Sequence, residues 1–158
     1  MPTGRISFIW GTNIIGIAML NSNGVATLTM SNLNAHPYPL TAVYSGDPNN
    51  GPSASPIVNQ VVKQTTSFAT LISSPNPSTQ GQAVTFTATI TSPTVMPTGP
   101  VTFAAGKTVL GTAQLSGGGK AKFTTSTLAV GSTEVTATYY GNSNIAKSSA
   151  SVTQTVHQ

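Results

Sequence analysis

Hydrophobic and polar residues alternate with a period of two along much of the second half of the chain. The clearest case is residues 83–92, where Val84, Phe86, Ala88 and Ile90 are separated by threonines. Successive side chains of an extended strand point to opposite faces, so this pattern predicts a half-buried β-strand with one apolar face. No stretch of the chain shows a convincing helical period.

Similar runs between Gly-, Pro- and Ser-rich turns predict six further strands. Residues 75–81 are rich in Pro and Gly and predict a loop, and Gly117-Gly118-Gly119 predicts a tight hairpin between the fourth and fifth strands. Seven short strands separated by frequent turns are typical of a β-sandwich, so we expect an all-β fold. The expected strands are 66–73, 83–92, 101–105, 109–115, 120–125, 134–140 and 150–156.

The chain matches itself without a gap when it is shifted by 95 residues. The segment Met1-Pro-Thr-Gly4 aligns with Met96-Pro-Thr-Gly99, and Tyr44 aligns with Tyr139. About a third of the 63 aligned positions are identical, and glycines and core-type residues dominate them. A match of this length at one fixed period indicates two copies of a single structural unit.

Several segments of the second copy carry a family resemblance. These segments are Pro97-Thr-Gly-Pro-Val-Thr-Phe103, Leu110-Gly-Thr-Ala113, Leu128-Ala-Val-Gly131 and Val135-Thr-Ala-Thr-Tyr-Tyr-Gly-Asn-Ser-Asn144. Together they resemble the bacterial Ig-like repeat domain. The resemblance covers residues 64–158 completely and residues 1–63 in part. It implies tandem Ig-like sandwiches of a large secreted or cell-surface protein, and it transfers no catalytic residues.

The first copy has no equivalent of residues 64–95 and therefore lacks the first two strands of the unit. In the second copy those strands supply Val84, Phe86, Ala88 and Ile90 to the expected core. Each large apolar side chain contributes about 1.5–3 kcal/mol when buried, whereas a whole domain is stable by about 5–15 kcal/mol. Residues 1–63 are thus expected to be an incomplete module that does not form a stable sandwich alone.

Three arrangements would complete the first copy. In the first, the missing strands lie upstream in a longer array, and in the second, a neighbouring molecule donates them by strand addition. Alternatively, residues 64–95 serve the first copy and leave 96–158 to be completed by another molecule. The last two arrangements build a head-to-tail contact, which gives rings or open filaments. The expected partners are therefore copies of the chain or adjacent Ig-like repeats of the same protein.

Comparison of the two copies also predicts a self-assembly interface. Positions that should point outward are apolar in the first copy only: Ile17 replaces Thr112, Met19 replaces Gln114 and Val25 replaces Lys120. These three are expected on the outer face of the adjacent fourth and fifth strands, and an apolar outer face indicates a contact surface. The expected interface residues are Ile9, Trp10, Ile17, Met19 and Val25.

Trp10 occupies a position that should point inward and that holds Ala105 in the second copy. It either fills volume left by the absent strands or anchors a partner, and we favour the first interpretation. His36 is expected in an exposed loop. Tyr44 and Tyr139 are expected to be buried near a corner of the sandwich, with each hydroxyl bonded to the backbone.

The composition argues against most other functions. The chain carries six Lys and Arg, two Asp and Glu, and no Cys. The pI near 9.7 results from the small number of acidic residues. The basic residues are scattered and form no basic stripe, so we expect no nucleic-acid partner. Asp47 and Glu134 are far apart in sequence, and no nucleophile has an oriented base. We therefore expect no catalytic site, metal site or cofactor.

No apolar run has the ~20 residues that a membrane-spanning helix needs. Residues 1–26 resemble a signal peptide, but they align with 96–121, which predict strand, turn and strand. The Thr- and Ser-rich surface suits a secreted or cell-surface protein. We expect a non-enzymatic structural module, either a fibre subunit or a spacer in a large adhesin-like protein. The alternative is a carbohydrate- or protein-binding accessory domain of a secreted enzyme.

Overall fold

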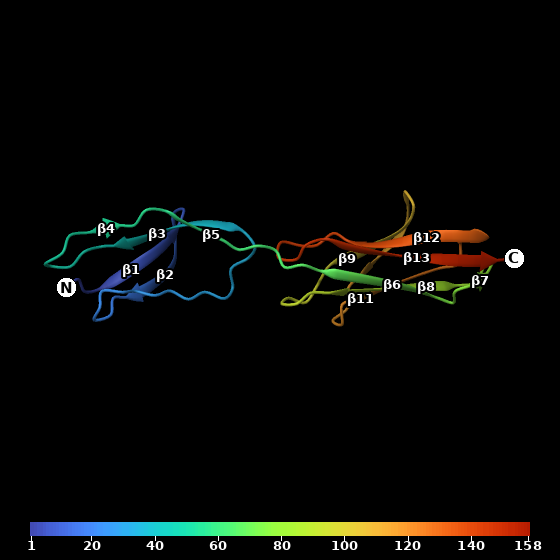
Figure 1. Cartoon of the computed structure of the whole chain (residues 1–158), viewed down its shortest axis with the longest axis horizontal. Coiled ribbons are helices and arrows are strands. Elements are labelled where there is room, and N and C mark those ends of the chain that lie inside the picture. The colour runs from blue at the N-terminus through green and yellow to red at the C-terminus, as the bar shows by residue number, and fades with distance from the viewer. The chain divides into compact units, whose positions relative to one another are not determined.

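The computed structural model describes all residues from Met1 to Gln158 and contains thirteen strands and no helix. The prediction of an all-β fold is therefore confirmed. The chain forms two compact units, which we call unit 1 (Met1–Lys63) and unit 2 (Gln64–Gln158). Figure 1 shows the strands of each unit along the chain.

Unit 2 is a complete sandwich of two sheets. One sheet has the strand order β10-β9-β12-β13-β7, and the other has the order β11-β8-β6. β7 is a two-residue strand that pairs in parallel with the end of β13, inside the segment expected to be a loop. The strands are β6 (Phe68–Ser74), β7 (Ser78–Thr79), β8 (Val84–Thr91), β9 (Pro100–Ala105), β10 (Thr108–Gln114), β11 (Lys120–Thr125), β12 (Gly131–Tyr139) and β13 (Ser148–His157).

The core of unit 2 lies between its two sheets. The apolar face of β8 is fully buried there, as its alternation predicts, with Val84, Phe86, Ala88 and Ile90 at most 1% exposed. Phe103 of β9 packs opposite them, and its ring stacks on Phe123 at a centroid distance of 5.5 Å. Residues from both sheets therefore share one continuous core.

The predicted hairpin at residues 117–119 is wrong. Ser116 and Lys120 close the turn through a backbone hydrogen bond, but the flanking strands do not pair with each other. β10 pairs with β9, and β11 pairs with β8 in the opposite sheet. The glycine turn thus carries the chain from one sheet to the other, because β8 offers β11 a partner that buries its apolar face.

Unit 1 contains a single sheet. Its strands are β1 (Arg5–Trp10), β2 (Asn13–Met19), β3 (Pro37–Tyr44), β4 (Ser53–Ala54) and β5 (Val58–Val61). β1 lies between β2 and β3, and β4 and β5 pair with successive parts of β3. Allowing for the 95-residue shift, these strands correspond to β9, β10, β12 and β13. Nothing in unit 1 corresponds to β6 or β8, and residues 25–30, which align with β11, form no strand.

A β-bulge explains a glycine shared by both units. In unit 1 the pairing of β1 with β2 shifts between Phe8 and Ile9, so Ile15 and Gly16 both turn toward the inner face. A Cβ atom on Gly16 would lie 2.5 Å from Leu28 Cδ1, and one on Gly111 would lie 2.3 Å from Phe123 Cε2. The glycine leaves room for the side chain that crosses over the sheet.

The two corner tyrosines are placed as predicted. The hydroxyl of Tyr44 donates to the carbonyl oxygen of Thr3 at 3.0 Å, and that of Tyr139 donates to the carbonyl oxygen of Thr98 at 3.1 Å. Both rings are buried, at 7% and 1% exposure. Burial also raises the pKa of both hydroxyls. Each tyrosine therefore ties the segment that precedes the first strand of the sheet to the strand on which it lies.

Candidate functional site

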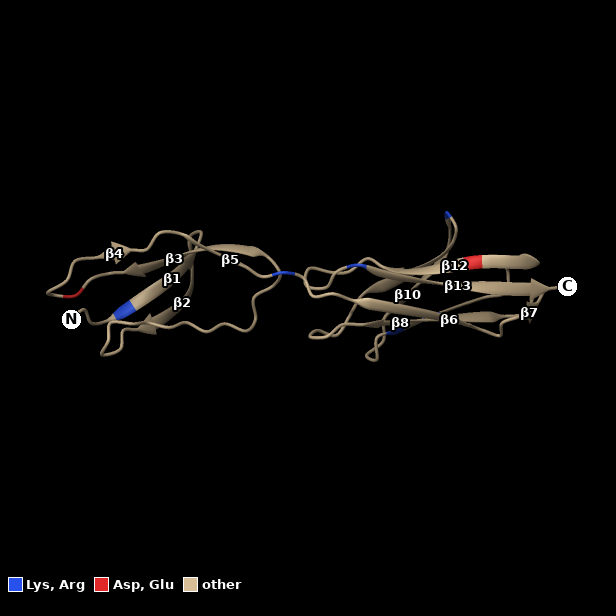
Figure 2. Ribbon diagram, in the orientation of Figure 1, with Lys and Arg blue, Asp and Glu red and all other residues tan.

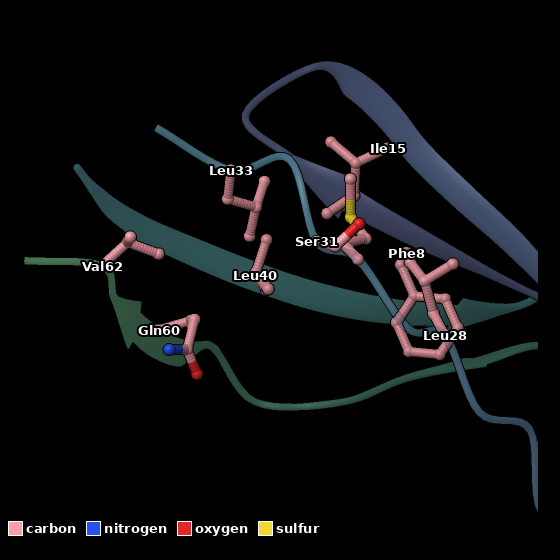
Figure 3. A pocket seen from close by; sticks show the side chains of 9 residues that line it. Phe8, Ile15, Leu28, Ser31, Leu33, Leu40, Gln60 and Val62 are labelled. Atoms are coloured by element: carbon pink, nitrogen blue, oxygen red, sulfur yellow. The ribbon is translucent and has the colours of Figure 1, made fainter. Parts of the chain in front are cut away.

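The inner face of the unit 1 sheet is covered only in part. A hollow of about 450 Å³ lies between the sheet and the segment that follows β2. Figure 3 shows Phe8, Ile15 and Leu40 reaching into it from the sheet, with Leu28 and Leu33 on the segment opposite. The complete lining is Phe8, Ile15, Leu28, Met30, Ser31, Leu33, Leu40, Gln60 and Val62.

The hollow exists because residues 20–36 cover the sheet as a single irregular segment. In unit 2 the same region contains β11, which is held by β8. Residues 26–30 have no such neighbour, and their backbone makes no hydrogen bond to another segment. Leu28 still packs over Gly16, so the segment follows the path of β11 without its hydrogen bonds.

Equivalent side chains are less buried in unit 1. Phe103 is fully buried in unit 2, whereas its counterpart Phe8 is only half-buried. Val135 of unit 2 is likewise fully buried, whereas its counterpart Leu40 in unit 1 is only half-buried. Of the fifteen buried hydrophobic residues in the chain, only Tyr38 and Tyr44 belong to unit 1. The incomplete module keeps its sheet but lacks a fully buried apolar core.

The five residues predicted to form the self-assembly interface do not share one surface. Ile9, Ile17 and Met19 lie on the outer face of β1 and β2, where Ser7 opposes Ile17 and Arg5 opposes Met19. Ile17 and Met19 are 49% and 68% exposed. Ile14, at 58% exposure, belongs to the same apolar face because it pairs with Ile9. The comparison of the two copies did not select Ile14, because its counterpart Val109 is apolar as well.

Val25 and Trp10 lie elsewhere. The fourth and fifth strands of the repeat, which we expected to be adjacent, are β10 and β11 in unit 2. They belong to different sheets, so their outer positions do not form one face. Val25 is exposed but lies outside the unit 1 sheet. Trp10 opposes Leu40 of β3 and therefore lies on the inner face.

Trp10 belongs to an aromatic cluster at one end of the unit 1 sheet. Its ring contacts Tyr38 at a centroid distance of 4.9 Å and His36 at 5.5 Å, both edge to face. The counterparts of these residues in unit 2 are Ala105, Thr133 and Gly131. Tyr38 is buried, Trp10 is half-buried and His36 is exposed, as expected for a loop histidine. The cluster therefore fills space that unit 2 leaves to small residues.

Asp47 is a turn residue with several local partners. Its carboxylate accepts hydrogen bonds from the Thr3 amide at 2.7 Å, the Asn49 amide at 2.9 Å and Asn50 Nδ2 at 2.8 Å. The Thr3 amide, followed by Asn50 and Asn49, holds the pKa of Asp47 well below its usual range. In unit 2, Asn142 Oδ1 takes the same place and accepts from the amides of Asn144 and Ile145.

Most charged residues are scattered along the ribbon (Figure 2), and Lys120 and Lys122 lie two positions apart on β11. No group of three or more His, Asp or Glu side chains comes together to hold a metal ion. No helix long and apolar enough to cross a membrane is present. The residues that line the hollow and form the cluster of unit 1 are mostly apolar and aromatic.

The structure is similar to that of a solved protein from Clostridium thermocellum, described as the fibronectin(III)-like modules of CbhA. The match covers 99% of this chain and 80% of the other, with a TM-score of 0.51 and 18% sequence identity. At this identity the likeness shows the fold alone. No curated protein matches the sequence.

The sequence profile of one family matches both units, over residues 1–63 and 71–157. The two segments together span nearly the whole chain. Domains of this kind are typically non-catalytic and commonly occur in extracellular or surface proteins. The chain thus belongs to the bacterial Ig-like domain family (group 3).

Proposed function

We propose that the chain is a non-enzymatic structural module of a bacterial extracellular or cell-surface assembly. Two forms of this role are possible: a spacer segment of a large adhesin-like protein, or a fibre subunit completed by strand exchange with a neighbour. The observation that carries the proposal is the pairing of a closed sandwich with an open half of the same repeat. Such a chain offers surfaces on which further repeats can pack. It shows no cluster of side chains that could form a metal site.

The outer apolar face of β1 and β2 supports a second contact within the same assembly. Ile9, Ile14, Ile17 and Met19 gather there, and apolar outer faces of this kind are typical of surfaces that meet another protein. We propose that this face lies against a neighbouring repeat or copy. Trp10, on the inner face, and Val25, outside the sheet, do not belong to it.

Size-exclusion chromatography with light scattering, together with electron microscopy of the full chain, tests the fibre form. We expect concentration-dependent association. A matched variant exchanges Ile17→Thr and Met19→Gln, which places the unit 2 residues in unit 1, and should associate less. Compact monomers at every concentration would eliminate the fibre form and leave the spacer form. Antibody labelling of intact producing cells tests the surface location shared by both forms, and label only after lysis would contradict it.

The second candidate function is a carbohydrate- or protein-binding accessory domain. The aromatic cluster of Trp10, His36 and Tyr38 favours it, because partly exposed aromatic rings are common in binding sites. A glycan array, with quenching of the fluorescence of Trp10 as the second readout, tests this candidate. Binding that Trp10→Ala abolishes would support it, and an absence of ligands would remove it.

A further inference from the structure

The complete unit shows what covers the position that is open in unit 1. β8 pairs antiparallel with β11 and places Phe86 opposite Phe123, Ala88 opposite Ala121 and Val84 opposite Thr125. β6 pairs with the other edge of β8. Under the 95-residue shift, the residues that β8 would face in unit 1 are Ala26, Leu28 and Met30.

Residues 25–30 already have the side-chain pattern of an acceptor strand. Ala26, Leu28 and Met30 are half-buried toward the sheet, whereas Val25, Thr27 and Thr29 are exposed. Leu28 approaches Gly16 as Phe123 approaches Gly111. The segment therefore runs in the register of β11, and what it lacks is a neighbouring strand.

The first residues of the chain also have the conformation that follows β8 in the complete unit. The carbonyl oxygen of Gly4 accepts from the Leu20 amide at 2.9 Å, and that of Gly99 accepts from the Leu115 amide at the same distance. Tyr44 binds Thr3 as Tyr139 binds Thr98. In unit 2 the equivalent segment, which contains Thr98 and Gly99, connects the end of β8 to the start of β9.

Exchange among copies of the chain cannot close every half. Each chain contains one strand pair of the β6–β8 type and two halves that need one, in unit 1 and in residues 96–158. Any transfer of residues 64–95 to unit 1 opens the core of a unit 2, so one half per chain always stays open. The occupant is therefore an additional strand pair.

We infer that the hollow of unit 1 is a strand-acceptor site for a further β6–β8-type strand pair of the same repeat. The second strand of that pair runs antiparallel to residues 25–30. It places a large apolar residue, the counterpart of Phe86, opposite Leu28, and smaller ones opposite Ala26 and Met30. This inference rests on the proposed structural role, and among its forms it selects the spacer in an array of repeats.

The test is to fuse a second copy of residues 64–95 in front of Met1 of the full chain. Hydrogen exchange followed by mass spectrometry then compares residues 25–30 with residues 120–125. We expect exchange at 25–30 to slow by about 100-fold or more relative to the parent chain, and to approach that of 120–125, because paired strands open rarely. Unchanged exchange at 25–30, with 120–125 still protected, would overturn the inference.

Two substitutions in the fused protein make the test specific. Leu28→Asp places a charge on the inner face and should abolish the gain in protection, whereas Thr27→Asp on the exposed face should preserve it. Equal protection in both variants would contradict the register. The outcome is separable from that of the proposed function. Fibres whose residues 25–30 are not protected in the fused chain would overturn this inference alone. Protection of residues 25–30 without antibody labelling of intact cells would overturn the proposed function alone.

Discussion

Units 1 and 2 build the same sheet from the same repeat, yet only unit 2 closes into a sandwich. Residues 25–30 and 120–125 alternate in the same way, and only the latter form a strand. The difference lies in the partner, because β8 supplies both the hydrogen bonds and the apolar face that β11 needs. Strand formation in this repeat thus depends on a segment distant in sequence, while the sheet around β1 and β9 forms in either case.

Unit 1 also differs by its aromatic cluster. Trp10, His36 and Tyr38 stand where unit 2 has Ala105, Gly131 and Thr133, and they pack edge to face at one end of the sheet. Edge-to-face pairs contribute about 0.5–1.5 kcal/mol beyond their buried area. The cluster therefore stabilises one end of the unit 1 sheet, which has no second sheet packed against it.

The largest expected difference between the units comes from a shared phenylalanine. Phe103→Ala should lower the free energy of unfolding of unit 2 by about 3–5 kcal/mol, as is usual for a fully buried ring. Phe8→Ala should cost unit 1 only about 1–2 kcal/mol, since burial of the whole ring is worth about 1.5–3 kcal/mol and Phe8 is half-buried.

Native-state hydrogen exchange of the full chain reads each unit separately. The fluorescence of Trp10, the only tryptophan, reports unit 1 independently. Equal costs for the two substitutions would mean that unit 1 has a closed core in solution, and the contrast between the units would fail.

Glycine-to-alanine substitutions at the bulge should give the next largest difference. Gly111→Ala forces the added methyl against Phe123, and overpacking of this kind costs about 1–3 kcal/mol. Gly16→Ala meets Leu28 instead, which lies on a segment free to move away, so we expect a cost below about 1 kcal/mol. Urea unfolding followed by hydrogen exchange measures both, and a larger cost at Gly16 would show that the segment is held firmly.

Much of the architecture could be predicted from the sequence. The period of two located β8 with its buried face, and the self-match located the repeat and the missing strands. These features are local or repeat within the chain, so the sequence displays them directly. The corner tyrosines Tyr44 and Tyr139 could be placed because both copies carry a tyrosine at the position of the sandwich corner, although each hydroxyl bonds to a residue far away in the sequence.

Features that depend on pairing between distant segments could not be predicted. Gly117-Gly118-Gly119 is a turn in either arrangement, and the choice of sheet for β11 depends on β8. The bulge at Phe8 and Ile9 moves Ile14 to the outer face and Ile15 to the hollow. The cluster of Trp10, His36 and Tyr38 joins β1 to β3 and its preceding loop, which only the register of the sheet reveals.

Removing the corner hydroxyls should give small and equal effects. Tyr44→Phe and Tyr139→Phe each lose one hydrogen bond to a backbone carbonyl oxygen, which costs about 0.5–1.5 kcal/mol. Both bonds lie at the shared start of the sheet, away from the missing strands. Parallel unfolding measurements on the two variants check this, and a clearly smaller effect in unit 1 would show that its corner is not formed.

The smallest expected effect concerns pH and distinguishes Asp47 from its counterpart Asn142. Because the hydrogen bonds to Asp47 lower its pKa in the folded chain, its contribution is complete above the unfolded value near 3.9 and declines as the pH falls below about 4. Unit 1, followed by Trp10 fluorescence between about pH 2 and 6, should therefore lose stability on acidification, and Asp47→Asn should remove that part of the loss. The reciprocal Asn142→Asp should introduce a weaker acid dependence into unit 2, because the amides of Asn144 and Ile145 bond to Asn142 there but the bonds from Thr3 and Asn50 have no counterpart. If Asp47→Asn leaves the pH profile of unit 1 unchanged, the bonds from Thr3, Asn49 and Asn50 do not persist in solution, and the turns of the two units are equivalent.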